Sequence, residues 1–262
     1  MTETPKIDFS KRLLDYTGQV VLVTGGRSGI GAATATAFAQ QGAKVIIAGR
    51  THATETLDKI KQLGGDAIFI QCDVSNDDDV QKLMGAIVDQ YGQLDVAFNN
   101  AGVGTSFAEL VDLTEDDFHH IFETDVKGVF LCMKYEIPIM LKQPTGGAII
   151  NCGSVVSEHA DPGMALYVGA KHAVAGLTRA ASIEYINRNI RINMLAPGFT
   201  ATEMTSDWIA DPEFLEIVKG FNFAHRWAEP EEMAGIVLFL GSPMASFMAG
   251  SLIAVDAGQA AH

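Results

Sequence analysis

The chain has 262 residues, of which 48% are hydrophobic and 19% are charged, a composition that is typical of a folded enzyme and excludes global disorder. Its formal net charge of −14 argues against nucleic acid or an anionic membrane as the main partner. No apolar stretch is long enough to span a bilayer and the N-terminus lacks a signal-peptide core, so we expect a cytoplasmic protein.

Seven short apolar runs alternate with longer helical patterns. Their near-continuous Val, Ile, Leu and Ala content is typical of strands buried on both faces, as in a parallel sheet. The predicted strands are Val20–Thr24, Lys44–Ala48, Ala67–Gln71, Leu94–Asn99, Ala148–Cys152, Ile190–Leu195 and Leu252–Val255. This alternation predicts an α/β fold, a Rossmann-like, doubly wound parallel sheet of about seven strands with helices on both faces.

Helices are predicted between these strands. The first runs from about Gly29 to Gln41 and the second from Ala53 to Leu63, where Gly64-Gly65 ends it. Residues 114–117, Thr-Glu-Asp-Asp, have the pattern of a capping box that opens a further helix.

Two segments depart from the alternation. Residues 1–16 precede the first strand, and we interpret them as a packed N-terminal arm. Residues 202–227 are long for a connection and rich in aromatic side chains, which is typical of a substrate lid, although the same residues could form local core. No linker divides the chain, so residues 17–262 are predicted to form a single catalytic domain.

The three cysteines, Cys72, Cys132 and Cys152, form neither a CxxC pair nor a Cys/His ligand spacing. We therefore predict no metal site. Their expected role is that of small buried hydrophobic residues in a reducing compartment.

A glycine-rich loop, Thr24-Gly25-Gly26-Arg27-Ser28-Gly29-Ile30-Gly31, follows the first strand and precedes an Ala-rich helix. That position is the one a dinucleotide-binding loop requires, because the glycines let the backbone approach a pyrophosphate held at the helix N-terminus. The spacing is a variant of GxGxxG. Asn99-Asn100-Ala101-Gly102 at the end of the fourth strand strengthens this interpretation, because ligands of such sheets bind beyond the carboxyl ends of the strands.

The choice of cofactor depends on the end of the second strand. An NAD enzyme generally places an acidic residue there, whereas this chain has Gly49 followed by Arg50. Arg50, helped by Arg27, could hold a 2′-phosphate by charge-assisted hydrogen bonds. We predict NADP(H), with NAD(H) possible. Asp73, in Cys72-Asp73-Val74, could bind the adenine amino group or simply form an Asx turn.

A proton-transfer group is predicted around Tyr167. Lys171 is one helical turn away and therefore lies on the same helix face, where its charge would lower the pKa of the phenol. Ser154 precedes the pair by 13 residues and could donate a hydrogen bond to the same reacting oxygen. A tyrosine of lowered pKa can give or take a proton near neutral pH.

These motifs in order, together with Pro197-Gly198-x3-Thr202 and Asp256-Ala257-Gly258, resemble those of the short-chain dehydrogenase/reductase family from Thr24 to Gly258. The resemblance implies that Tyr167 is the acid/base, that Ser154 holds the substrate oxygen and that Lys171 also binds the nicotinamide ribose. It implies nicotinamide contacts from Pro197, Gly198, Thr200 and Thr202, and a homotetramer as the assembly. The cofactor-binding residues predicted in full are Gly25, Arg27, Ser28, Gly29, Ile30, Gly31, Arg50, Asp73, Val74, Asn100, Ala101, Gly102, Tyr167, Lys171, Pro197, Gly198, Thr200 and Thr202.

One position departs from the family pattern. Asp125 stands where the family usually has an asparagine that positions a water molecule on a proton path from the lysine. We expect the path to survive, and we expect the Asp125 charge to offset part of the effect of Lys171 on the pKa of Tyr167.

The implied reaction is reversible hydride transfer between a nicotinamide and a ketone or secondary alcohol. The predicted substrate residues are mostly apolar: Ser154, Val156, His159, Met164, Phe199, Met204 and Trp208. They favour a hydrophobic ketone. A sugar or polyol and a 3-oxoacyl thioester stay open as alternatives, and a non-catalytic NADP-sensing scaffold is a more distant one.

Overall fold

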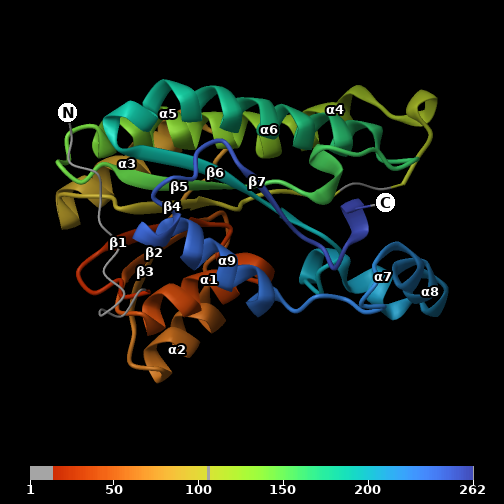
Figure 1. The fold of residues 1–262 in the computed structure, drawn as a ribbon, viewed down its shortest axis with the longest axis horizontal. Helices are drawn as coiled ribbons and strands as arrows, with labels where there is room; N and C mark the ends of the chain where they lie inside the picture. Colours follow the sequence, from red (N-terminus) through yellow and green to blue (C-terminus); the bar gives the residue numbers. More distant parts are fainter. Residues whose placement is uncertain (1–13, 105–106, 262) are drawn as a thin grey trace.

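The computed structural model describes residues 14–104 and 107–261, and its centre is one sheet of seven parallel strands in the order β3-β2-β1-β4-β5-β6-β7 (Figure 1). The order reverses between β1 and β4, so the loops that follow these two strands flank a crevice at the carboxyl edge. Residues 1–13 of the predicted arm lie outside the described residues. The strands are β1 (Val20–Thr24), β2 (Lys44–Gly49), β3 (Asp66–Gln71), β4 (Val96–Asn99), β5 (Gly147–Cys152), β6 (Ile190–Pro197) and β7 (Leu252–Val255).

Helices cover both faces of the sheet (Figure 1). One face is covered by α3 (Asp77–Tyr91), α4 (Glu115–Phe122), α5 (Gly128–Met140) and α6 (Ala165–Tyr185), and the other by α1 (Gly29–Gln40), α2 (Thr54–Gln62) and α9 (Pro230–Gly241). Two helices, α7 (Ser206–Ala210) and α8 (Pro212–Phe221), project beyond the carboxyl edge. Shorter helical turns are η1 (Leu110–Asp112), η2 (Glu123–Lys127), η3 (Val155–Ser157), η4 (Ile186–Arg188), η5 (Glu203–Thr205), η6 (Pro243–Ala245) and η7 (Gln259–Ala261). Within the described part of the chain, no helix has the length and apolar character that a bilayer crossing requires.

The sheet divides the hydrophobic core into two layers. Along β1, Val20 and Leu22 belong to the layer beneath α3, α5 and α6, while Val21 and Val23 belong to the layer beneath α1 and α9. This alternation follows from the two-residue period of a strand and requires apolar residues on both faces. The apolar runs in the sequence therefore predict the strands well.

The predicted elements are confirmed with small shifts at their ends. β4 begins at Val96 and not at Leu94, because both main-chain groups of Leu94 bond to the side chain of Gln143, at 2.7 and 3.1 Å. The predicted capping box is present. The amide of Asp117 donates to the Thr114 hydroxyl at 3.2 Å, and the Asp117 carboxylate accepts from the Thr114 amide at 2.8 Å.

A buried polar network joins the sheet to the α5–α6 layer. Asn99 on β4 donates to Glu136 of α5 at 3.1 Å and to Asn151 of β5 at 3.0 Å, and Asn151 donates to Thr178 of α6 at 2.9 Å. All four side chains are buried. The network fixes β4 and β5 next to the site, because Asn99 directly precedes Asn100 and Asn151 directly precedes Cys152.

Glu136 should make stability depend on pH. Burial raises the pKa of its carboxyl from 4.5 to about 8, against the lowering effect of the Asn99 hydrogen bond. Between these two values the folded chain keeps a proton that the unfolded chain releases, so this stabilising contribution is fully present below about pH 4.5 and is lost as pH rises through about 8. Glu136→Gln should therefore raise Tm relative to the unchanged chain more at pH 9 than at pH 5.

The free-energy difference behind this shift is about 1.4 kcal/mol for each unit by which the folded-state pKa exceeds the unfolded-state value. Thermal unfolding of both proteins across the pH range measures it. A difference in Tm that stays constant with pH would show that Glu136 does not take up a proton on folding.

Candidate active site

The glycine loop after β1 adopts a backbone conformation that residues with a Cβ atom would disfavour. Gly25 and Gly29 have φ angles of 67° and 55°, in the left-handed region that favours glycine. A Cβ atom on Gly31 would lie 2.4 Å from the carbonyl oxygen of Gly25. The loop therefore brings bare backbone to the crevice at the strand-order reversal.

The loop after β4 is tied to the glycine loop. The Asn100 side chain donates to the carbonyl oxygens of Thr24 and Gly25 at 3.1 and 3.2 Å, while the Thr24 hydroxyl accepts from the amides of Asn100 and Ala101, both at 3.0 Å. These bonds account for the pairing of the two motifs in the sequence. They hold both sides of the crevice in one fixed arrangement.

The residues present fit a dinucleotide. Helix α1 has no side-chain cap at Ser28 and no acidic residue in its first turn, so its terminal amides and its positive dipole end are available to a pyrophosphate. In contrast, α3 and α4 both begin with a capping side chain and three acidic residues. The glycine cradle and this uncapped helix end together are what a phosphate-binding site requires.

The two arginines that are predicted to bind the 2′-phosphate differ in their contacts. Arg50 is exposed at the carboxyl end of β2. Arg27 forms an ion pair with Glu203, which comes from the segment beyond β6. Asp73 forms an Asx turn, because its carboxylate accepts from the Ser75 amide at 3.0 Å, and its contact with the adenine amino group stays a prediction. Val74 is buried nearby.

Asp125 is aimed at the site by a π-helical turn, η2 (Glu123–Lys127), between α4 and α5. Such turns are frequent at functional sites. The Asp125 carboxylate is buried, accepts from the amide of Val103 at 2.8 Å and lies 2.8 Å from the ammonium of Lys171. It therefore connects the loop after β4 to helix α6.

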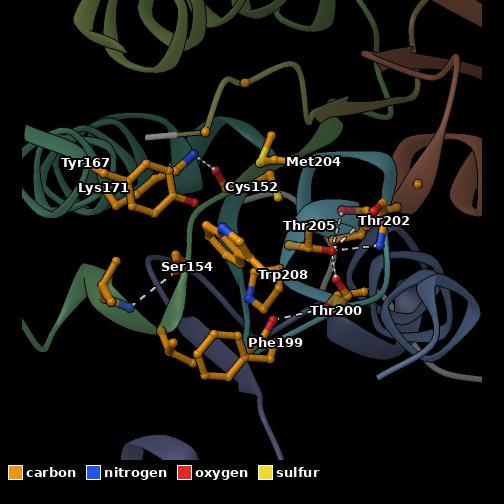
Figure 2. Close-up of a pocket in the computed structure, with 18 of the residues that line it drawn as sticks. Cys152, Ser154, Tyr167, Lys171, Phe199, Thr200, Thr202, Met204, Thr205 and Trp208 are labelled. Atoms are coloured by element: carbon orange, nitrogen blue, oxygen red, sulfur yellow. Dashed lines mark hydrogen bonds between the residues drawn. The ribbon is translucent and has the colours of Figure 1, made fainter. Parts of the chain in front are cut away.

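Lys171 is held by two partners on different elements. Besides the Asp125 carboxylate, its ammonium group contacts the carbonyl oxygen of Cys152 at the end of β5, at 3.4 Å (Figure 2). Burial is the largest single influence and disfavours the charged ammonium, but Asp125, Tyr167 and Cys152 together outweigh it, so the pKa of Lys171 lies above its usual value. This shift favours the charged form of Lys171, whose Nζ lies 5.2 Å from the centre of the Tyr167 ring.

The pKa of Tyr167 differs from the sequence-based expectation. Burial in the pocket wall raises it, Lys171 lowers it, and Asp125 raises it again, so the net shift is upward. A hydrogen bond with Ser154 lowers it in part. The expected opposition between Asp125 and Lys171 is present, because the paired carboxylate cancels part of the ammonium's field at the phenol.

These groups open into a cavity of about 500 Å³ at the carboxyl edge (Figure 2). Most predicted site residues line it together: Gly25, Ser28, Gly29, Ile30, Asn100, Ala101, Gly102, Ser154, Val156, Met164, Tyr167, Lys171, Pro197, Gly198, Phe199, Thr200, Thr202, Met204 and Trp208. The cavity thus joins the glycine loop to the Ser154–Tyr167–Lys171 group.

His159 lies elsewhere. Its ring nitrogen Nε2 is 2.8 Å from the carbonyl oxygen of Ala260, it is absent from the cavity lining, and the neighbouring Glu158 forms an ion pair with Arg179. Sequence reasoning missed several lining residues: Phe107, Cys152, Val155, Asp161, Phe214, Ile217, Phe221 and Gln259. The aromatic content of residues 202–227 could have indicated Phe214 and Phe221 as lining residues. Phe107 belongs to no motif, so the sequence offered no comparable indication.

Residues 202–227 are attached to the site at both ends. At one end a Cβ atom on Gly29 would lie 3.0 Å from the Thr202 side chain, so the segment touches the glycine loop. At the other end the Phe223 amide donates to the carbonyl oxygen of Ala257 at 3.0 Å, and the Phe223 ring packs on Gly258. Between these attachments α7 and α8 form one wall of the cavity.

Comparison with known proteins gives consistent matches over most of the chain. A family model described as enoyl-(acyl carrier protein) reductase matches residues 24–260. A 3-oxoacyl-[acyl-carrier-protein] reductase of Synechocystis is 38% identical over 248 residues, 92% of this chain and 97% of the relative. A 3beta-hydroxysteroid dehydrogenase of Mediterraneibacter gnavus is 35% identical over 261 residues, 92% of this chain and 94% of the relative.

A solved structure agrees with the fold. The short-chain type dehydrogenase/reductase from Mycobacterium marinum has a TM-score of 0.90 and 33% sequence identity, and the match covers 94% of this chain and 97% of that chain.

Proposed function

The chain belongs to the short-chain dehydrogenase/reductase family, and on that basis we propose that it is an NADP(H)-dependent oxidoreductase that interconverts a ketone and a secondary alcohol. The observation that carries the proposal is the convergence of Ser154, Tyr167 and Lys171 with the glycine loop in one cavity. Residues 17–262 would form one catalytic domain, with 202–227 as its substrate lid.

Tyr167 is the proposed acid/base. In reduction its phenol gives a proton to the substrate oxygen, which Ser154 holds by a hydrogen bond, and in oxidation the phenolate takes that proton back. The bound dinucleotide supplies the hydride in reduction and accepts it in oxidation. Lys171, held charged by Asp125, stabilises the phenolate that remains on Tyr167.

The proposed cofactor is NADP(H). Gly49 leaves no carboxylate at the end of β2, and the exposed Arg50 guanidinium can pair with a 2′-phosphate. Pro197, Gly198, Thr200 and Thr202 would hold the nicotinamide end. Arg27 can add a second contact to the 2′-phosphate when it leaves Glu203.

A 3-oxoacyl thioester is the second candidate substrate, because the family model and the Synechocystis relative both name an acyl carrier protein. We further propose a cytoplasmic homotetramer. Cys72, Cys132 and Cys152 are free thiols, in accord with a reducing compartment, and light scattering of the purified protein measures its assembly.

Replacing Tyr167 by Phe removes the proton donor while keeping the ring. We expect Tyr167→Phe to lower kcat by about 10²–10⁴-fold and to leave the Kd for NADPH unchanged. Tyr185→Phe is the matched control, since Tyr185 lies near the far end of the same helix. Full activity of Tyr167→Phe in a ketone-reduction assay would refute the assignment.

Removing the guanidinium of Arg50 should lower the affinity for one cofactor and not for the other. Arg50→Ala should reduce kcat/KM for NADPH by about 10–100-fold, which is the loss expected for charge-assisted hydrogen bonds, and leave kcat/KM for NADH nearly unchanged. Steady-state kinetics with both cofactors measure this. A preference of the unchanged protein for NADH would contradict the proposal. So would an equal loss of kcat/KM with NADPH and NADH in Arg50→Ala.

Asp125→Asn should shift the pH dependence of catalysis. The Asp125 carboxylate raises the pKa of Tyr167, so removing its charge should lower that pKa and move the acid limb of kcat/KM for alcohol oxidation to lower pH. Asparagine keeps a side-chain oxygen for the Val103 amide. A limb that stays in place would show that the carboxylate does not act on Tyr167, and a limb that moves upward would show that its main effect is to keep Lys171 charged.

A further inference from the structure

The cavity beyond Ser154 and Tyr167 has a wall of aromatic side chains. Trp208 of α7 and Phe214 of α8 are stacked, with ring centroids 5.2 Å apart and planes at 25°. Phe107, from the loop after β4, lies against both, at 5.4 Å from Trp208 and 6.1 Å from Phe214. Figure 2 shows Trp208 near the centre of the view, and Ser154, Tyr167 and Lys171 line the same cavity.

This wall leaves much apolar surface uncovered. Phe107 is 48% exposed, Met204 51% and Ile217 47%, although all three line the cavity. Exposed apolar surface gathered in a hollow marks a ligand site, because a hydrophobic ligand would remove it from water. This apolar surface lines the same cavity as Ser154 and Tyr167.

Charges at the cavity oppose an anionic substrate. Of the described residues that line it, Lys171 alone carries a basic side chain, and its ammonium is already paired with Asp125. In the sequence, residues 199–221 contain one lysine and five acidic residues, Glu203, Asp207, Asp211, Glu213 and Glu216. Among the described lining residues a carboxylate substrate would find no unpaired cation, and the acidic residues of 199–221 would repel an acidic carrier protein.

Shape favours rings over chains. Stacked aromatic faces offer a flat, rigid surface, and aromatic contacts of this kind add to the gain from area alone. A ring system loses little conformational freedom on binding, whereas each rotatable bond of a linear chain loses more. The volume of about 500 Å³ is shared with the glycine-loop side, so one or two fused rings fit better than a long chain.

From these observations, and resting on the proposed ketone reduction, we propose that the substrate is an uncharged cyclic ketone or alcohol of one or two rings that packs against Trp208. The ring carbonyl accepts hydrogen bonds from Ser154 and Tyr167, and the apolar part of the ring system lies against the aromatic wall. Sugars fit this wall poorly, because their hydroxyl groups would lose water there without gaining partners.

The test compares two ketones of equal carbon count with NADPH, the bicyclic β-decalone and the linear methyl octyl ketone. We expect kcat/KM for β-decalone to be at least about tenfold higher. A cyclohexanone that carries a carboxylate, and the acetoacetyl thioester of N-acetylcysteamine, should both be poorer substrates than β-decalone. A linear ketone or thioester that equals β-decalone would overturn the proposal and leave the ketone-reductase function standing.

Variants of Trp208 test whether the aromatic wall causes the preference for the bicyclic ketone over the linear one. Trp208→Leu should raise KM for β-decalone about tenfold with little change for methyl octyl ketone, and Trp208→Phe should keep most of the preference. Phe247→Leu, at a fully exposed position outside the cavity lining, is the control. If Trp208→Leu left the ratio of kcat/KM for β-decalone to kcat/KM for methyl octyl ketone unchanged, the proposed contact between Trp208 and the substrate ring would be refuted. Absence of turnover with every ketone, in protein that still binds NADPH, would instead refute the proposed function itself.

Discussion

The buried ion pair between Asp125 and Lys171 is the interaction on which the site depends. It joins four elements, since Asp125 belongs to the π-helical turn and accepts from the loop after β4, while Lys171 belongs to α6 and contacts the end of β5. A lysine buried without a partner tends to lose its proton. With Asp125 beside it the lysine stays charged, and its field reaches Tyr167 in a form that the carboxylate has weakened.

A buried pair of this kind contributes more to geometry than to stability, because the cost of removing two charges from water offsets their attraction. Here its partners come from separate segments, so it fixes where β5, α6 and the loop after β4 lie relative to one another. The network of Asn99, Asn151 and Glu136 does the same one layer further from the cavity. Both sets of polar groups lie at the boundary between the apolar core and the cavity.

The sequence predicts what depends on local pattern. The buried strand β1 has apolar residues on both faces and is found to the residue, as is the less buried edge strand β7, and the glycine motif has an obligatory backbone form. Contacts between segments that are distant in the sequence produce no local sequence pattern that would predict them. Phe107 reaches the cavity because the loop after β4 folds towards α7 and α8, and Arg27 meets Glu203 because residues 202–227 begin at the glycine loop. The pKa of Tyr167 is raised mainly by burial, which spacing on one helix does not reveal, whereas the opposing charge of Asp125, 42 residues away, is expected from the family pattern.

The two attachments of residues 202–227 separate the proposed substrate wall from the proposed catalytic residues. Thr202 packs on the glycine loop and Phe223 on the C-terminal turn, while the proposed proton-transfer residues lie on other segments, Tyr167 and Lys171 on α6 and Ser154 directly before η3. The wall between the attachments can therefore acquire new side chains while the reaction stays the same. Such an arrangement lets one scaffold diversify during evolution, since a mutation in α7 or α8 changes which molecule is accepted and leaves the means of transforming it intact.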